Sequence, residues 1–218
     1  MLGLSGGLDS SVAAALCHAA MGDHSLGLIM PCESTPEDAE DAQLAAATYG
    51  VKTVTVDLNG VFKQFLEVLP GSAVPVAANL KSRLRMATLY FWANNLSYLV
   101  VGTGNRSELM TGYFTKYGDG AADLLPLGAL YKTDIIRLAR FLSVPERIIQ
   151  KPPSAGLWRG QTDEDEMGIS YENLDGILMA MESGSATDGA DPESRLVEDM
   201  VAHSLHKRST PPVFEARE

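Results

Sequence analysis

The feature that most constrains this 218-residue chain is the alternation of short apolar runs with helical stretches through its first half. The apolar runs cover residues 2–4, 25–30, 51–58 and 97–101. The helical stretches cover residues 10–21, 36–49, 61–69 and 79–94. Strands that alternate with helices join into parallel sheets through right-handed crossovers. We therefore expect an α/β fold with a doubly wound, mostly parallel sheet and helices on both faces.

The second half changes character, with two long irregular segments between shorter helices. Residues 112–128 are rich in glycine and aromatic side chains without a sustained period, which predicts an ordered functional loop. Residues 151–168 predict a second loop that could close as a lid. The expected helices are residues 133–142, one that begins at Ser170, and one from Asp191-Pro192 to about His206. With no repeat and no long linker, residues 1–218 are expected to form a single domain.

The charge and cysteine content exclude several classes of partner. The chain has 17 Lys and Arg against 28 Asp and Glu, a formal net charge of -11, which opposes non-specific binding to nucleic acid or anionic lipid. Its longest apolar stretch, residues 12–21, is shorter than the roughly 18 residues of a membrane span. Cys17 and Cys32 suit a reducing compartment, and no signal peptide is visible. We expect a cytoplasmic protein with no nucleic-acid or membrane partner.

A glycine-rich string lies where the first strand passes into the first helix. Its sequence is Leu4-Ser5-Gly6-Gly7-Leu8-Asp9-Ser10. Backbone N–H groups and the positive end of the helix dipole converge on an anion at such a junction. The glycines allow close backbone approach and the serines offer hydroxyl donors. An isolated Gly-Gly is more often a simple turn with a capping side chain, but the complete string favours phosphate binding.

The acid in this string distinguishes it from other phosphate loops. A Walker loop needs a lysine before its Ser or Thr, whereas this chain has Asp9 there, and a dinucleotide fingerprint is absent. A carboxylate beside bound phosphate is repelled unless a cation lies between them. Asp9 therefore predicts Mg²⁺ bridging the carboxylate and the phosphate oxygens.

This Ser-Gly-Gly-x-Asp-Ser string resembles the signature of the N-type ATP pyrophosphatases. Members of that superfamily adenylate a carboxyl or carbonyl oxygen and release pyrophosphate. The resemblance implies attack at the α-phosphate of ATP and leaves the second substrate open.

A second acid is expected at the same edge of the sheet. Residues 101–108 leave the fourth predicted strand, so Glu108 could meet Asp9 around one Mg²⁺. The alternative is that Glu108 simply opens a helix as an N-terminal acid.

The following segment selects the substrate. Residues 111–127, Thr-Gly-Tyr-Phe-Thr-Lys-Tyr-Gly-Asp-Gly-Ala-Ala-Asp-Leu-Leu-Pro-Leu, resemble the long signature of the ammonia-dependent NAD synthetases. The resemblance continues through Lys132, residues 151–155 and 163–171, and His206-Lys207. It implies an adenine nucleotide alpha hydrolase-like fold and a carbon–nitrogen ligase that amidates deamido-NAD to NAD with ammonia and ATP, through an adenylated nicotinate, releasing pyrophosphate and AMP. It also implies a homodimer with deamido-NAD at the subunit interface, and no glutaminase domain is expected here.

The resemblance also assigns roles to individual residues. The residues assigned to ATP, the co-substrate, are Gly3, Leu4, Ser5, Gly6, Gly7, Leu8, Asp9, Ser10, Thr103, Lys132 and Ser154. Those assigned to deamido-NAD are Arg83, Lys116, Asp123, His206 and Lys207. Asp9 and Glu108 would bind Mg²⁺, and the catalytic residues would be Asp9, Lys132 and Asp119. Ser154 replaces a threonine common in relatives, so a hydroxyl is kept.

Simpler interpretations stay open for several of these residues. Arg83 and Lys116 could be solvated charges, and His206 could favour the end of the last helix. The rings of residues 113, 114 and 117 could stack on a ligand or anchor their loop. The acids at residues 163–166 fit a solvated turn better than a metal site.

Two other function classes compete with the amidation. One is a different pyrophosphatase-loop enzyme, such as a tRNA sulfur-transfer enzyme or the amidating domain of a GMP synthetase. The acidic charge opposes the tRNA enzyme. The other is a nucleotide-binding sensor, which would bind ATP without releasing pyrophosphate.

Overall fold

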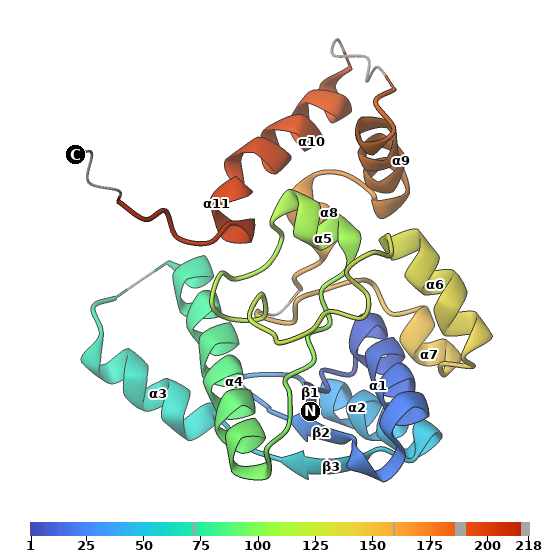
Figure 1. The fold of residues 1–218 in the computed structure, drawn as a ribbon. Coiled ribbons are helices and arrows are strands. Elements are labelled where there is room, and N and C mark those ends of the chain that lie inside the picture. Colours follow the sequence, from blue (N-terminus) through green and yellow to red (C-terminus); the bar gives the residue numbers. More distant parts are fainter. Residues whose placement is uncertain (72, 159, 186–190, 215–218) are drawn as a thin grey trace.

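A parallel sheet organises the fold in the computed structural model, which describes residues 1–71, 73–158, 160–185 and 191–214 (Figure 1). Its strands are β1 (Leu2–Gly3), β2 (Leu26–Ile29) and β3 (Lys52–Thr55), paired in that order. Both pairings are parallel, with Leu2 opposite Gly27 and Leu26 opposite Lys52.

The predicted fourth strand at residues 97–101 is wrong in extent, because only Val101 pairs with the sheet. Val101 bridges Leu2 on one side and Leu124 on the other, both in parallel. The ladder stops there because the N–H of Val100 donates to the Asp123 carboxylate at 2.7 Å rather than to a neighbouring strand. β2 and β3 therefore lie on one side of β1, and Val101 and Leu124 lie on the other. In doubly wound sheets ligands bind at such a switch point, outside the carboxyl ends of the strands.

Helices cover both faces of the sheet, which confirms the predicted fold class. The helices α1 (Leu8–Met21) and α2 (Pro36–Tyr49) pack on one face, and α3 (Asn59–Val68) and α4 (Val74–Leu96) pack on the other (Figure 1). The alternation along β2 divides its side chains between the two layers. Ile29 joins the core under α1 and α2, while Leu28 and Met30 join the core under α3 and α4.

The C-terminal helices form a further layer, which packs on α5 (Arg106–Thr111) and α6 (Lys132–Phe141) rather than on the sheet (Figure 1). The remaining helices are the short 3-10 turn Gly22–His24, α5 (Arg106–Thr111), α6 (Lys132–Phe141), α7 (Glu146–Ile149), α8 (Asp163–Met167), α9 (Tyr171–Glu182), α10 (Pro192–His203) and α11 (Leu205–Arg208). Helix α7 was not predicted, and α8 lies inside the predicted loop 151–168. The last predicted helix is broken at Ser204, short of His206.

The predicted loop at residues 112–128 is confirmed, since it forms turns and one bridge. Helix α4 begins earlier than expected because Pro75 sits in its first turn, where a proline costs no hydrogen bond. Within the ranges the structure describes, no helix is both long and apolar enough to cross a membrane.

Candidate functional site

The turn between β1 and α1 has the backbone of an anion-binding loop. Gly6 has φ +79°, and a Cβ there would lie 2.3 Å from the carbonyl oxygen of Asp38, so only glycine fits. Gly7 is the N-cap of α1, and no side chain in the described residues caps this end. The first-turn N–H groups of α1 are therefore left for a ligand, at the positive end of the helix dipole.

Serine hydroxyls hold this turn in shape. The hydroxyl of Ser10 donates to the carbonyl of Gly7 at 3.0 Å and lies 3.0 Å from the hydroxyl of Ser5. Ser5 Oγ in turn accepts from the N–H of Gly7 at 3.2 Å. These local bonds fix the loop before any ligand binds.

A buried lysine joins the two predicted acids beside this loop. Lys132, the first residue of α6, is 3% exposed. Its Nζ pairs with Asp9 Oδ2 and lies 3.8 Å from Glu108 Oε1. Asn105 Nδ2 donates to the other oxygen of Asp9 at 3.0 Å. The structure thus brings the two acids that were expected to meet, Asp9 and Glu108, together around Lys132.

Burial and neighbouring charge shift the pKa values in this cluster. Burial, reinforced by the charge of Asp9, raises the pKa of Glu108 to about 8. Burial alone would lower the pKa of Lys132, but the attraction of Asp9 and Glu108 outweighs it, and the pKa is raised. Lys132 therefore carries its positive charge between two acids at neutral pH.

The alternative reading of Glu108 as a helix-opening acid is confirmed, and it coexists with the contact to Lys132. Asn105 is the N-cap of α5 and accepts from the N–H of Glu108 at 3.0 Å. Glu108 Oε2 accepts from the N–H of Asn105 at 3.2 Å, while Oε1 is the oxygen nearer Lys132. The capping box therefore orients the carboxylate toward the lysine.

The donor set fits an ion that arrives with a nucleotide rather than a closed protein site. Among the described residues, no group of three or more His, Cys, Asp or Glu could hold a metal ion. Asp9 and Glu108 supply hard carboxylate oxygens around Lys132, the kind of ligand that Mg²⁺ takes when phosphates and water complete its shell.

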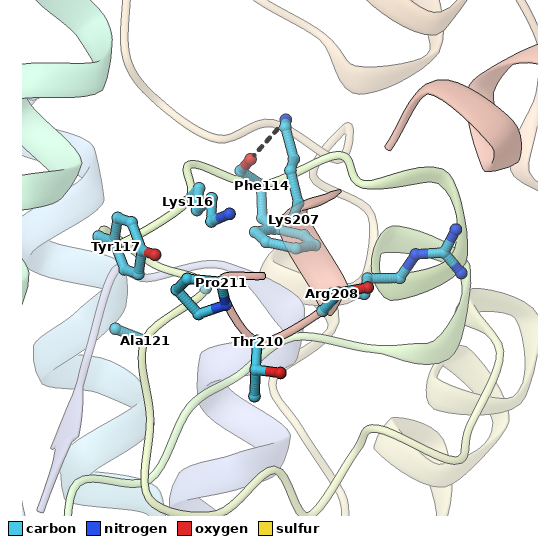
Figure 2. A pocket seen from close by; sticks show the side chains of 10 residues that line it. Phe114, Lys116, Tyr117, Ala121, Lys207, Arg208, Thr210 and Pro211 are labelled. Atoms are coloured by element: carbon cyan, nitrogen blue, oxygen red, sulfur yellow. Dashed lines mark hydrogen bonds between the residues drawn. The ribbon is translucent and has the colours of Figure 1, made fainter. Parts of the chain in front are cut away.

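A pocket of about 300 Å³ lies between the loop 112–128 and the C-terminal segment (Figure 2). Its lining residues are Phe114, Lys116, Tyr117, Gly120, Ala121, Lys207, Arg208, Ser209, Thr210 and Pro211. Lys207 Nζ donates to the carbonyls of Gly112 and Phe114 at 2.7 and 2.9 Å, and lies 5.5 Å from the Phe114 ring centre. Lys116 Nζ lies 5.3 Å from the Tyr117 ring centre. Cations and aromatic faces therefore share this pocket.

A smaller cavity of about 40 Å³ lies between the loop 112–128 and Glu108. Thr103, Glu108, Phe114 and Asp119 are among its lining residues. Asp119 Oδ1 accepts from the N–H of Thr115 at 3.0 Å, which fixes its direction. The cavity is large enough to hold a molecule the size of water, which needs roughly 10–15 Å³ of such space.

Two residues assigned to deamido-NAD lie beside the large pocket without lining it. Arg83 is exposed, and its NH2 donates to the carbonyl of Lys116 at 3.4 Å. His206 is exposed, and its carbonyl accepts from Lys116 Nζ. Both therefore contact the loop that forms the pocket wall.

Two other predicted residues make local contacts instead. Ser154 is exposed, and its hydroxyl accepts from the N–H of Gly156 at 3.0 Å, outside both cavities. The Asp123 carboxylate accepts from the N–H of Val100 and, at 3.2 Å, from the Tyr90 hydroxyl. Its observed contacts fasten the loop to the sheet.

Tyr171 and Asp163 lie near Lys132 but were not among the predicted site residues. The Tyr171 ring centre lies 5.1 Å from Lys132 Nζ, and the Tyr171 hydroxyl donates to Asp163 Oδ2 at 3.1 Å. The expected solvated turn is wrong for Asp163, which is 4% exposed and whose pKa is raised by burial. The spacing of Asp163 and the apolar Met167, one helical turn apart, was the available signal of a shared buried face.

Comparison with known proteins places this arrangement in one family. Residues 1–211 match the sequence profile described as NAD synthase. The curated NH(3)-dependent NAD(+) synthetase of Finegoldia magna is 50% identical over 216 residues, which is 99% of this chain and 87% of that protein. The enzyme of the same name from Archaeoglobus fulgidus is 50% identical over 221 residues, covering 100% of this chain and 89% of that protein.

Solved structures agree with the fold. An NMN synthetase from Francisella tularensis superposes with a TM-score of 0.88 at 36% identity, over 99% of this chain and 88% of that one. An NH3-dependent NAD synthetase from Campylobacter jejuni, in complex with the nitrate ion, gives 0.84 at 29% identity, over 98% and 88%. The predicted adenine nucleotide alpha hydrolase-like fold is confirmed. By profile, sequence identity and coverage, this chain belongs to the NAD synthase family.

Proposed function

We propose that this chain is a carbon–nitrogen ligase that amidates deamido-NAD to NAD with ammonia and ATP. The observation that carries the proposal is the meeting of Asp9, Glu108 and Lys132 beside an uncapped helix N-terminus at the switch point of the sheet. NH(3)-dependent NAD(+) synthetases match the chain over nearly its whole length, which supports the proposal.

ATP would bind with its phosphates on the loop 4–10. The N–H groups at the start of α1 and the hydroxyls of Ser5 and Ser10 lie at this turn and would donate to the phosphate oxygens. Asp9 and Glu108 would hold Mg²⁺ with the phosphates, and the ion would neutralise charge on the triphosphate. Lys132 would turn from Asp9 to the phosphate oxygens, keeping its positive charge.

In the first step an oxygen of the nicotinate carboxylate forms a bond to the α-phosphorus while the bond to the β-phosphate bridging oxygen breaks. Pyrophosphate leaves with the electron pair of that bond. Lys132 and the backbone amides of the loop stabilise the charge that develops on it. In the second step the ammonia nitrogen bonds to the carbonyl carbon, the carbon–oxygen bond to AMP breaks, and a proton leaves the nitrogen.

Deamido-NAD would occupy the pocket of about 300 Å³. Lys116 and Lys207 supply positive charge for its pyrophosphate and carboxylate, and Phe114 and Tyr117 supply stacking faces (Figure 2). Arg83 lies against the same loop. The proposed roles of Asp123, His206 and Ser154 require that substrates draw their side chains into the site.

The cavity of about 40 Å³ is the proposed place of ammonia. Asp119 would act there as a catalytic group, accepting a hydrogen bond or a proton from the attacking nitrogen. Its carboxylate is already oriented by the N–H of Thr115.

A homodimer is part of the proposal. Exposed apolar side chains gather at the end of α3 and the start of α4, the largest exposed fractions being 81% for Val68, 59% for Val74 and 60% for Val76. Clustered apolar side chains of this kind mark protein interfaces. Arg83 lies two helical turns after Val76 on the same face of α4, so an interface here would extend toward the deamido-NAD pocket.

Residues 151–168 are proposed to close over the bound substrates and exclude water from the acyl-adenylate. Lys81 Nζ donates to the carbonyl of Leu157 at 2.7 Å, and Lys151 Nζ pairs with Asp38 at 2.7 Å, so the segment is tethered at two points.

We further propose a single catalytic domain that uses free ammonia in the cytoplasm.

The test is pyrophosphate release from ATP with a panel of acids: deamido-NAD, nicotinic acid mononucleotide, XMP and no acid. The mononucleotide is included because a structural relative is named an NMN synthetase. We expect release with deamido-NAD and formation of NAD in the presence of ammonia. Release with XMP alone would identify a GMP synthetase activity. Preferential release with nicotinic acid mononucleotide would show that this mononucleotide, rather than deamido-NAD, is the substrate. ATP binding without release under any condition would indicate a sensor.

A further inference from the structure

A buried carboxylate on α9 connects the helices that carry Lys132 and Glu108. Asp175 lies in the middle of α9 and is 1% exposed. Its Oδ2 accepts from the N–H of Thr133, in the first turn of α6, at 2.9 Å. Its Oδ1 accepts from the hydroxyl of Ser107, in the first turn of α5.

Ser107 passes this contact on to the lysine itself. While its hydroxyl donates to Asp175, the same oxygen accepts from the backbone N–H of Lys132 at 3.0 Å. Ser107 also directly precedes Glu108 in α5. One carboxylate thus fixes the start of α6, where Lys132 stands, relative to the start of α5, where Glu108 stands.

These contacts replace a missing cap. Tyr131, the N-cap of α6, makes no side-chain capping bond. The first N–H groups of a helix have no partner within it and are costly to bury alone. Asp175 and Ser107 accept from two of them, and the negative charge of Asp175 lies at the positive end of the α6 dipole.

A second contact on the same face of α9 repeats the connection at the surface. Glu182, two turns after Asp175, pairs with Arg106 of α5 and accepts from the Tyr131 hydroxyl. Its side chain is 35% exposed, so this pair contributes less than the buried one.

From this geometry we propose that Asp175 is a positioning residue for the adenylation step, acting through the backbone of Lys132 by way of Ser107 and Thr133. The inference rests on the proposed role of Lys132 at the phosphates. Asp175 is buried and lines neither of the two cavities described above. By fixing the backbone of Lys132, it positions the Lys132 ammonium group relative to the Asp9 and Glu108 carboxylates.

The experiment is a double-mutant cycle with Asp175→Asn and Lys132→Met, measured as kcat for NAD formation at saturating ATP, deamido-NAD and ammonia. Asparagine keeps the shape of the side chain but places an amide N–H against one of the two donors. We expect Asp175→Asn to lower kcat about 10- to 100-fold, since a displacement of 1 Å can cost about 100-fold. In the Lys132→Met background it should lower kcat less than about two-fold, because residues that act through one another are not additive.

The matched control is Asp191→Asn. Asp191 accepts from the N–H and hydroxyl of Ser194 at the start of α10, both at 3.0 Å, so it is also a carboxylate at a helix N-terminus. This control should leave kcat within about two-fold. If Asp175→Asn does not fold, Ser107→Ala, which removes only the hydroxyl between Asp175 and the Lys132 N–H, takes its place in the same cycle.

Each outcome separates the inference from the proposed function. If Lys132→Met lowers kcat and Asp175→Asn lowers it by the same factor in both backgrounds, the positioning role is wrong and the role of Lys132 stands. A loss of thermal stability with unchanged kcat would likewise leave Asp175 a purely structural residue. If Lys132→Met leaves kcat unchanged, the proposed role of Lys132 is wrong, and the inference is overturned with it.

Discussion

Single residues in the acid cluster carry separable parts of the chemistry. Asp9 contacts Lys132 and Asn105, so its carboxylate is held where the metal-bound phosphates are expected. We predict that Asp9→Asn lowers kcat about 100-fold or more at saturating MgATP, on the order of 3 kcal/mol, and changes the Kd of ATP less than about 10-fold. Steady-state kinetics and equilibrium binding measure the two effects.

The control for this variant is Asp134→Asn, on the same helix as Lys132 but paired at the surface with Arg137, which is 77% exposed. It should be nearly silent, since surface pairs contribute little. Near wild-type kcat for Asp9→Asn at saturating Mg²⁺ would contradict the metal role.

Glu108 gives the ligand-free protein a predictable response to pH. Its pKa is 4.5 in the unfolded chain and about 8 in the folded protein. Between these values the folded protein keeps a proton that the unfolded chain has lost, so the free energy of unfolding falls as pH rises. Below about pH 4.5 Glu108 is protonated in both states, so its titration does not change the free energy of unfolding. Above about pH 8 it is ionised in both states, and the free energy of unfolding has fallen by the full amount.

The variant Glu108→Gln removes this titration and keeps a residue suited to the capping box. Without Mg²⁺ or nucleotide, the Tm of Glu108→Gln relative to that of the wild type should rise as the pH is raised from about 5 to about 8.5. Thermal unfolding at several pH values measures it. A difference that stays constant across this range would show that the pKa of Glu108 is not raised.

At the scale of elements, the turn between β1 and α1 is the part most sensitive to substitution. Gly6→Ala forces a side chain into a left-handed conformation, at roughly 1–2 kcal/mol, and into contact with Asp38. We predict a Tm lower by at least about 2–8 °C and a KM for ATP raised at least about 10-fold. Gly60→Ala in α3, where a Cβ meets nothing within 4 Å, should keep both values or raise Tm slightly. Equal behaviour of the two variants would contradict the role of the loop.

Elements set by local signals were predictable, and those set by distant contacts were not. Helix α2 has the predicted bounds because Thr35 and Asp38 form a capping box, Pro36 follows the cap, and Gly50 ends the helix in a left-handed conformation. The fourth strand was overestimated because an Asp123 side chain, distant in sequence, takes the N–H of Val100.

The same distinction holds within the site. The phosphate loop and its acid follow from a short contiguous string, so Asp9 was predictable. Glu108 was expected near Asp9 because residues 101–108 leave the fourth predicted strand, whereas Lys132 was assigned through family resemblance. The contact between Glu108 and Lys132 depends on how α5 and α6 pack. The burial of Asp175 depends on the packing of α9 against α5 and α6, which no local pattern in the sequence contains. For Asp163 the spacing to Met167 was the one local signal.

At the scale of the whole molecule, the exposed apolar side chains of α3 and α4 should be covered by a second copy of the chain. Sedimentation velocity should show a dimer at micromolar concentration. Val76→Asp, which places a charge on a side chain that is 60% exposed, should shift it to a monomer. Because Arg83 lies on the same face of α4, the monomer should have a raised KM for deamido-NAD and a nearly unchanged affinity for ATP. A monomeric wild-type protein with full activity would contradict the dimer.

In the proposed reaction, the nicotinate carboxylate attacks the α-phosphorus of ATP held on the loop 4–10. The most direct measurement uses deamido-NAD with both carboxylate oxygens labelled with ¹⁸O, followed by mass spectrometry of the products formed with ATP and ammonia. We expect one labelled oxygen in AMP, one in the amide of NAD and none in pyrophosphate. Label in pyrophosphate or inorganic phosphate, or unlabelled AMP accompanying NAD formation, would contradict it.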